Sequence, residues 1–413
     1  AKFLSKRAIK SPAGLPRFEA LLGLIYAGCY LKNMEKFIEP ATMALADECH
    51  HLLNNEEIVS SRNPQEVLNI FTILIWAKLA LKDSNWNPSS THLATIEKLA
   101  PILRSLRHSD AGLPRFHGSC GDVDGQLDQA LSNAESREIS PIEKSVGFVK
   151  LSNSRTTIII DAAPPPMGKK AVKADASTLA FEMVSGQRRI FTSCGPGYLF
   201  GSNLSSASRQ TSSHSVVYID NQNSSQFSDK ESWLKIPKKV IINGPRNVPK
   251  EISNDQGICI FEGAHDGYVK SYGLTHVRKL KLAQDGHTFE GEDLIIAIEG
   301  SHKRQFDKIA KKTSRGSLSV KAAFHLHPDV TLRLDQENHF VSLALKNGEV
   351  WIFNYSSDLN LDLKPSVFFE NDLFEPLGSQ KLILSSDILE YGTRIKWSIA
   401  KARNKDLSVG DLF

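Results

Sequence analysis

The chain contains two long regions in which hydrophobic residues repeat with different periods. In the first 135 residues, apolar side chains recur every three or four positions over segments of helix length. After about residue 140, β-branched and aromatic residues form short runs that are separated by Gly, Asn, Asp, Ser and Pro. The change of period predicts a helical domain over residues 1–135 and a strand-rich domain over residues 140–413.

The helical region divides into four segments, at residues 15–31, 34–53, 65–82 and 91–107. Asn63 precedes Pro64 and Glu66, which is typical of a helix N-terminus, because Asn caps free backbone N–H groups and Pro fits the first turn. Either Ser90 or Thr91 is suited to cap the fourth segment. Helices of similar length with short polar connections predict antiparallel pairs in an all-α layer or toroid.

The second region predicts at least a dozen short strands. Asn347-Gly348, between two such runs, is the strongest hairpin signal in the chain. Many short strands with few intervening helices indicate a sandwich of antiparallel sheets. The expected fold class is therefore α+β and multidomain, with an incomplete (α/α) toroid followed by an antiparallel β-sandwich.

Composition narrows the possible classes of protein. The 413 residues include 50 Lys and Arg against 46 Asp and Glu, so the net charge of +4 argues against a nucleic-acid partner. We expect no membrane span, because no run approaches the roughly 18 consecutive apolar residues that a span needs. The basic start of the chain leads to no apolar segment of a signal peptide. Five scattered cysteines without a CxxC pair are expected to be free thiols.

Histidine, tyrosine and arginine residues gather in expected loops and strand ends, where binding groups tend to lie. The segments are SRNP (61–64), GLPRFHG (112–118), KADASTLAFE (173–182), SSHSVVYID (212–220), GAHDGY (263–268), GLTH (273–276) and FHLHP (324–328). Signatures of dinucleotide, P-loop, HExxH and GxSxG proteins are absent from the sequence. The order and spacing of the seven segments resemble the heparinase II/III-like family of polysaccharide lyases, and the resemblance extends over nearly the whole chain.

This resemblance implies β-elimination on a polysaccharide that contains uronic acid. Such a reaction requires donors that neutralise the uronate carboxylate, a Tyr or His that removes the adjacent proton, and a group that protonates the leaving oxygen. The residues that the resemblance nominates are His117, His214, His265 and Tyr268 for catalysis, and Arg62, Asn63, His108, Arg115 and His276 for substrate binding.

Several of these residues also have an ordinary structural interpretation. Asn63 is explained as a helix cap, whereas Arg62 has no such local role and is the better carboxylate binder. His214 is either a functional group or a hydrogen-bonded core histidine. The Asp266-Gly267 turn either presents Tyr268 to a cleft or packs its ring on the sheet.

Two expected strands carry further basic residues. His276 begins a segment that continues through Arg278, Lys279 and Lys281, which either covers an acidic glycan or forms a charged outer face. His325 and His327 alternate along a strand, so both would point to one face, for a ligand or for solvent.

The sequence departs from the family's His-x-His motif. Lys173 and Asp175 occupy its two positions, and the second histidine of that motif is a zinc ligand in the family. The remaining residues able to hold zinc by this correspondence are Asp175, Cys194 and His214, since zinc accepts mixed oxygen, sulfur and nitrogen ligands. Either no cofactor or a zinc ion is therefore expected.

Three hypotheses follow. The leading one is a polysaccharide lyase-like protein that cleaves a glycosaminoglycan-like or alginate-like polymer by β-elimination. Its alternative is a non-catalytic protein of the cell envelope that binds acidic glycan and retains the fold. A third is a metal-dependent hydrolase that uses Asp175 and His214. The expected partner is an acidic polysaccharide, which favours the bacterial periplasm or envelope, with the cytoplasm as the alternative; the oligomeric state is left open.

Overall fold

The computed structural model describes residues 1–54, 59–121, 125–134, 146–168, 172–228, 239–313, 316–337 and 339–402. The chain divides into two compact units. The first comprises Ala1–Arg107, Ala111–Leu113 and Gly121–Val146, and the second His108–Asp110, Pro114–Cys120 and Gly147–Phe413. The expected domain boundary, residues 135–140, lies outside the described residues. Residues 108–110 and 114–120, which the periodicity assigns to the helical part, belong to the second unit instead.

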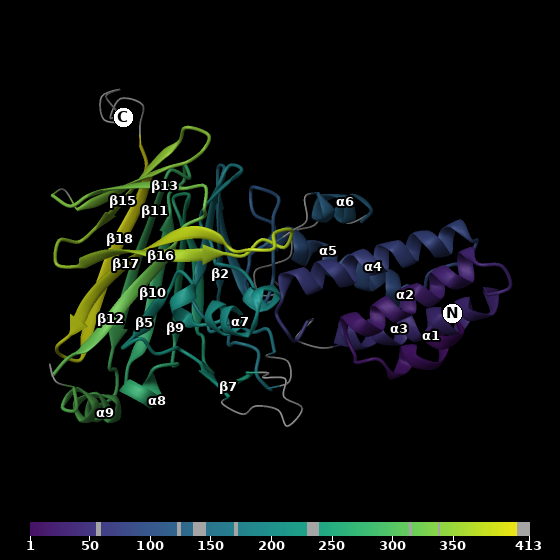
Figure 1. Cartoon of the computed structure of the whole chain (residues 1–413), viewed down its shortest axis with the longest axis horizontal. Helices are drawn as coiled ribbons and strands as arrows, with labels where there is room; N and C mark the ends of the chain where they lie inside the picture. Colours follow the sequence, from purple (N-terminus) through teal and green to yellow (C-terminus); the bar gives the residue numbers. More distant parts are fainter. Residues whose placement is uncertain are drawn as a thin grey trace. The chain divides into compact units, whose positions relative to one another are not determined.

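The first unit is helical, as predicted (Figure 1). Its helices are α1 (Lys2–Arg7), α2 (Leu15–Tyr30), α3 (Ile38–Asn54), α4 (Pro64–Asp83), α5 (Ser90–Leu106) and α6 (Gln126–Ser132). Each of the four long helices contacts two others, because α2 packs against α3 and α4, and α5 packs against the same two helices. The mutual packing buries the apolar side of each helix within the unit.

Helix α4 is the core helix of this unit. Asn63 caps it, since its Oδ1 accepts hydrogen bonds from the backbone N–H groups of Gln65 at 2.9 Å and Glu66 at 3.3 Å. Within the part of the chain that the structure describes, α4 is the one helix long and apolar enough to cross a membrane. However, 72% of its most apolar stretch is buried inside the protein, as is usual for the central helix of a helical domain.

The second unit is built mainly of antiparallel sheets (Figure 1). Its strands are β1 (Phe148–Asn153), β2 (Thr156–Asp161), β3 (Phe181–Ser185), β4 (Arg188–Phe191), β5 (Val217–Ile219), β6 (Gln226–Phe227), β7 (Ile241–Asn243), β8 (Lys250–Asp255), β9 (Ile258–His265), β10 (Thr275–Leu282), β11 (Thr288–Ile296), β12 (Leu318–His325), β13 (Thr331–Asp335), β14 (Phe340–Ala344), β15 (Val350–Tyr355), β16 (Asn360–Phe368), β17 (Leu377–Ile388) and β18 (Gly392–Lys401). Its helices are α7 (Ser202–Ser208), α8 (Val269–Tyr272) and α9 (Gly300–Ala310).

Three large sheets contain most of these strands. Their orders are β1-β2-β3-β4, β13-β14-β15-β18-β11-β10-β9-β8 and β16-β17-β12-β5, and β6 pairs with β7 in a small fourth sheet. The predicted hairpin at Asn347-Gly348 joins β14 to β15, with Gly348 at a φ of 84°. Three strands were not predicted from the sequence: β6 is only two residues long, β8 is an almost wholly polar edge strand, and β16 contains Pro365.

Aromatic side chains from all three large sheets form one core. Phe181 on β3 stacks on Trp397 of β18, with ring centroids 5.5 Å apart and an interplanar angle of 11°. Phe324 on β12 contacts the same indole edge-on at 4.9 Å. These contacts show that the three large sheets share one aromatic core.

Candidate functional site

The best candidate site in the second unit is a buried group of polar side chains around His117. The backbone of His117 has a φ of 55°, and Gly118 follows with a φ of 82°, so the loop makes a left-handed turn there. Only the glycine adopts this conformation without steric cost, because a side chain on His117 crowds its own backbone there. Contacts with Asp175 hold the turn in place.

His117 and Asp175 form a reciprocal pair. The backbone N–H of His117 donates to Asp175 Oδ2 at 2.5 Å, and the backbone N–H of Asp175 donates to His117 Nδ1 at 3.2 Å. Since Nδ1 accepts a hydrogen bond, the neutral ring carries its proton on Nε2. That nitrogen lies 3.2 Å from Asp161 Oδ2 but makes no hydrogen bond among the described residues. Asp161 Oδ2 accepts a hydrogen bond from Ser177 Oγ at 2.7 Å. Two hydrogen bonds with Asp175, one to the backbone N–H of His117 and one to its Nδ1, therefore hold His117 in place.

His214 lies in the same buried region. Its Nδ1 is 3.1 Å from Ser193 Oγ, and its ring centroid is 6.1 Å from that of Phe116. Burial lowers the pKa of His214, and the negative charge of Asp175 only partly offsets this effect. The ring is therefore neutral at pH 7, and its Nε2 has no hydrogen-bond partner among the described residues.

Glu182 on β3 organises a second part of the region. Its Oε1 accepts hydrogen bonds from the backbone N–H groups of Ser193 at 2.9 Å and Arg115 at 3.2 Å. Its Oε2 lies 3.7 Å from His108 Nε2 and 3.6 Å from Arg189 Nη1. Burial alone would raise the pKa of Glu182, but the adjacent His108 and Arg189 outweigh burial and lower the pKa. The carboxylate is thus charged, and His108 is 1% exposed beside it.

Arg115 is a structural clamp. Its Nη1 donates to the carbonyl of Cys120 at 2.5 Å, its Nη2 donates to the carbonyl of Phe369, and its guanidinium lies 4.2 Å from the Phe368 ring centroid. A Cβ on Gly195 would lie 2.4 Å from Arg115 Nη2, so only glycine leaves room for the guanidinium. With its donors directed at backbone carbonyls and 4% of its surface exposed, Arg115 ties the 114–120 loop to the segment after β16.

A second buried network contains three more of the nominated residues. Gly267 N–H donates to His265 Nδ1 at 3.1 Å, so the proton of His265 lies on Nε2, which is 3.2 Å from His276 Nδ1. His276 Nε2 in turn lies 2.7 Å from Asp293 Oδ1. Tyr268 Oη donates to the backbone carbonyl of Val217 at 3.2 Å, and burial raises the pKa of Tyr268 well above its usual range. The side chains of His265, His276 and Tyr268 thus all bind other groups of the protein.

Arg278 joins the two regions. It binds Asp293 through Nε at 2.7 Å and Nη2 at 3.0 Å. Its Nη1 donates to the carbonyl of Leu179 at 2.8 Å and to that of Ser215 at 2.9 Å. Leu179 and Ser215 are close in sequence to residues around the first region, so Arg278 anchors those segments to the eight-stranded sheet.

The remaining nominated residues, Arg62 and Asn63, belong to the first unit. Asn63 caps α4, which agrees with its structural interpretation. Arg62, at a φ of 52°, donates from Nε to the carbonyl of Val146 at 3.1 Å and is 7% exposed. Arg62 therefore has a role in holding its own unit together.

The zinc hypothesis finds no ligand set in the structure. Across the described ranges, no three His, Cys, Asp or Glu side chains lie close enough together to hold a metal ion. Cys194 Sγ instead lies 3.5 Å from the carbonyl of Gly195 and 3.8 Å from that of Ser208, and burial raises its pKa to about 12. Asp175 is engaged by His117, and Ser193 stands between Glu182 and His214. These residues do not fit a zinc ion.

Of the two histidines in the FHLHP segment, His325 is buried and His327 is half-buried. β12 ends at His325, whose Nδ1 is 3.0 Å from Ser366 Oγ and whose Nε2 is 2.9 Å from the carbonyl of Ser212. His327 lies beyond the strand, where its Nδ1 accepts from Asp329 N–H at 3.2 Å and its ring contacts Phe368. The expected row of two histidines on one open strand face is therefore wrong.

The exposed groups next to the His117 loop are ones that the sequence analysis did not select. Lys173 packs against Gly118, and its Nζ lies 4.3 Å from the Tyr198 ring centroid. Tyr198, which is 39% exposed, also has its Oη 3.9 Å from Cys120 Sγ. The sequence could have indicated Tyr198 as a candidate, because it follows Gly195-Pro196-Gly197. Segments rich in Gly and Pro tend to form surface loops that present side chains to solvent.

The comparison with protein families identifies the class to which this chain belongs. Residues 141–398, more than half of the chain, match the heparinase II/III-like C-terminal domain. The chain belongs to this family, and the resemblance inferred from its motifs is confirmed.

Several known proteins are similar over most of this chain. FtsZ-localized protein C of Caulobacter vibrioides is 27% identical over 384 residues, which cover 91% of this chain and 64% of that protein. A heparinase III has a TM-score of 0.70 at 14% identity, covering 97% of this chain and 62% of its own. The heparan sulfate lyase HepC of Pedobacter heparinus has a TM-score of 0.66 at 14% identity. The match covers 94% of this chain and 60% of the lyase chain.

These similarities establish the fold at a coarse level. The chain has a helical N-terminal part and C-terminal antiparallel sheets, similar to heparinase III, as the expected fold class stated. The chain spans less than two thirds of the length of the three proteins compared. A closed toroid and a two-sheet sandwich remain predictions.

Proposed function

We propose that this protein binds an acidic polysaccharide through a polysaccharide-lyase fold and does not cleave it with the nominated histidines and tyrosine. One observation carries the proposal: His117, His214, His265 and Tyr268 are each at most 1% exposed. A group that takes a proton from a substrate must reach that proton within hydrogen-bond distance. Here these side chains are enclosed by the fold, and most of their polar atoms already have protein partners.

Two further points support binding over cleavage. Lys173 replaces the first histidine of the family motif, and its ammonium group is suited to bind a carboxylate. The relative that matches 91% of this chain is named for its localisation with FtsZ and not for an activity. A role in binding at a defined cellular site is consistent with that name.

β-Elimination is the second candidate, and the exposed Lys173 and Tyr198 favour it. Burial raises the pKa of Tyr198 to about 12, so its phenol stays protonated at pH 7 and is suited to donate a proton to a leaving oxygen. A cation beside it is suited to a uronate carboxylate. This pair supplies an acid and a carboxylate binder, but no base.

The experiment combines binding and turnover. Purified protein is titrated calorimetrically with heparan sulfate, hyaluronate and alginate oligosaccharides, and the absorbance of unsaturated product is followed in parallel. We expect binding to at least one polymer and no product. Product formation that Tyr198→Phe abolishes and the matched Tyr268→Phe leaves intact would establish the lyase and overturn the binding proposal.

Cellular location is part of the same proposal. An acidic polysaccharide partner favours the periplasm or cell envelope, whereas a shared role with the FtsZ-localized relative favours the division site. A fluorescent fusion of the full-length protein, imaged together with labelled FtsZ in dividing cells, separates the two. Uniform peripheral signal supports the envelope, and a midcell band supports the division site.

A further inference from the structure

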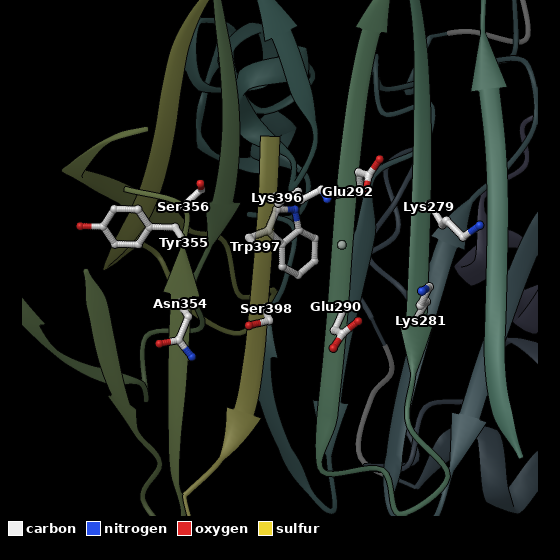
Figure 2. A pocket seen from close by; sticks show the side chains of 11 residues that line it. Lys279, Lys281, Glu290, Glu292, Asn354, Tyr355, Ser356, Lys396, Trp397 and Ser398 are labelled. Atoms are coloured by element: carbon white, nitrogen blue, oxygen red, sulfur yellow. Dashed lines mark ion pairs between the residues drawn. The ribbon is translucent and has the colours of Figure 1, made fainter. Parts of the chain in front are cut away.

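A shallow depression of about 430 Å³ lies on the eight-stranded sheet, away from the buried region described above. Strands β10, β11, β18 and β15, which are adjacent in the sheet, contribute its lining (Figure 2). Alternation along β10 directs His276, Arg278 and Leu280 into the core, and Lys279 and Lys281 to the outer face. The basic segment identified in the sequence is thus divided between the two faces.

Four polar side chains form a row across these strands, which we call the open row: Lys281, Glu290, Ser398 and Asn354. The strand register pairs Lys281 with Glu290, Glu290 with Ser398, and Ser398 with Asn354. Figure 2 shows them side by side along one edge of the depression. Among the described residues, none of the four makes a side-chain hydrogen bond or ion pair, and all are exposed or half-buried. Their polar atoms are available to a ligand.

The neighbouring row differs because its charges are satisfied within the protein. Lys279 Nζ lies 3.0 Å from Glu262 Oε2. Glu292 is bound by Arg394 at 3.1 Å and by Lys396 at 3.6 Å. Only the open row therefore combines a free ammonium and a free carboxylate with a hydroxyl and an amide.

The surface of the sheet between the two rows is tightly packed. Gly291 and Trp397 are register partners at its centre, and a Cβ on Gly291 would lie 2.0 Å from Trp397 Cζ2. The indole therefore packs directly against the glycine backbone from the core side, where it stacks on Phe181. Polar groups on such a floor are held at fixed spacing, which reduces the entropy lost on binding a ligand.

We propose that the open row is a binding site for an extended acidic oligosaccharide, separate from the His117 region. Lys281 would bind an acid group of the sugar chain, and Glu290, which as a carboxylate only accepts hydrogen bonds, would receive sugar hydroxyls. Ser398 and Asn354 both donate and accept, as sugar hydroxyls do. Neighbouring strands are about 4.8 Å apart, which is close to the length of one sugar ring in an extended chain. The row therefore offers one polar side chain to each successive sugar.

This inference rests on the proposed glycan binding. The experiment distinguishes whether the protein binds glycan from where on the protein the glycan binds. Lys281→Ala, Glu290→Ala and, as a matched control, Lys364→Ala are titrated with the oligosaccharide that the wild-type protein binds. Lys364 is an exposed strand lysine on β16, in a different sheet. Circular dichroism and thermal unfolding of each variant verify that it is folded. We expect Lys281→Ala and Glu290→Ala each to weaken binding about tenfold, and the control to bind as wild type.

Glu290→Ala is the decisive variant. If the sheet attracts acidic polymers by charge alone, removing a carboxylate strengthens binding, and that result would overturn the proposal. Wild-type affinity in both open-row variants would place the glycan elsewhere and leave the proposed function standing. A wild-type protein that binds none of the polymers would reject the proposed function and this site together.

Discussion

His276 Nε2 lies 2.7 Å from Asp293 Oδ1, and both side chains are fully buried. The same carboxylate also binds Arg278 through two nitrogens and lies 3.4 Å from Trp397 Nε1. Burial would raise the pKa of Asp293, but the positive charge of Arg278 and the interaction with His276 outweigh burial and keep the pKa far below its usual range. Asp293 thus neutralises the guanidinium that anchors the Leu179 and Ser215 segments.

Asp293→Asn is expected to destabilise the second unit by about 3–5 kcal/mol, because it leaves the buried Arg278 without a counter-charge. Urea unfolding followed by tryptophan fluorescence measures the loss. The control is Glu262→Gln, which removes an ion pair whose side chains are 41% and 51% exposed and should cost about 1 kcal/mol or less. Equal effects of the two substitutions would contradict the anchoring role of Asp293.

His325 makes the stability of the protein depend on pH. Burial and the charge of Lys381 lower its pKa to about 3, whereas an unfolded chain has a histidine pKa near 6.5. Between these values the unfolded chain binds the additional proton, so the stabilisation from neutral His325 is complete above about pH 6.5 and is lost as the pH falls toward 3. From pH 6.5 to 5, the loss should be about 2 kcal/mol.

Urea midpoints of wild type and His325→Gln at pH 8 and pH 5 check this dependence. The variant should be less stable than wild type at pH 8, and the difference should shrink at pH 5. His287→Gln is the control, since the side chain of His287 is 56% exposed and lies outside the core. A difference between wild type and His325→Gln that is the same at both pH values would count against the buried neutral ring.

Gly291→Ala tests the packing of the sheet core. Because the added methyl group would lie 2.0 Å from Trp397 Cζ2, the indole must shift, at a cost of about 1–3 kcal/mol. Gly378→Ala on β17 is the matched control, since no atom lies within 4 Å of its added Cβ. That control should be neutral or slightly stabilising. Chemical denaturation distinguishes the two variants, and a tolerated Gly291→Ala would show that the floor of the depression is not tightly packed.

Asn63 allows its two interpretations to be separated. Asn63→Ala should cost about 1 kcal/mol through loss of the α4 cap, whereas Asn63→Asp keeps an accepting oxygen and should retain most of the stability. Helical circular dichroism during thermal unfolding gives both values. If Asn63→Asp unfolds as wild type but loses glycan affinity, Asn63 is a substrate-binding residue and not only a cap.

The pattern of apolar residues predicted most of the helices and strands because each depends on a short stretch of chain. The segment 65–82 differs from α4 by a residue at each end, since Asn63 and Pro64 define its start locally. β8 was missed because an exposed edge strand buries little and needs no apolar alternation. Residues 108–110 and 114–120 belong to the second unit, where they lie against Glu182, Asp161 and Asp175. Because these three residues are distant in sequence, periodicity could not place the two segments.

For the candidate residues too, some features follow from neighbouring residues in the sequence and others from contacts between distant residues. The sequence by itself determined the two regions, the family and the residue types that carry polar chemistry, because periodicity and motifs are properties of neighbouring residues. Only the tertiary structure decided that His117, His214, His265 and Tyr268 lie inside the fold, while Lys281, Glu290, Ser398 and Asn354 form an open row. Burial and side-chain pairing depend on which strands become neighbours, and strand order is set by contacts between residues far apart in the chain.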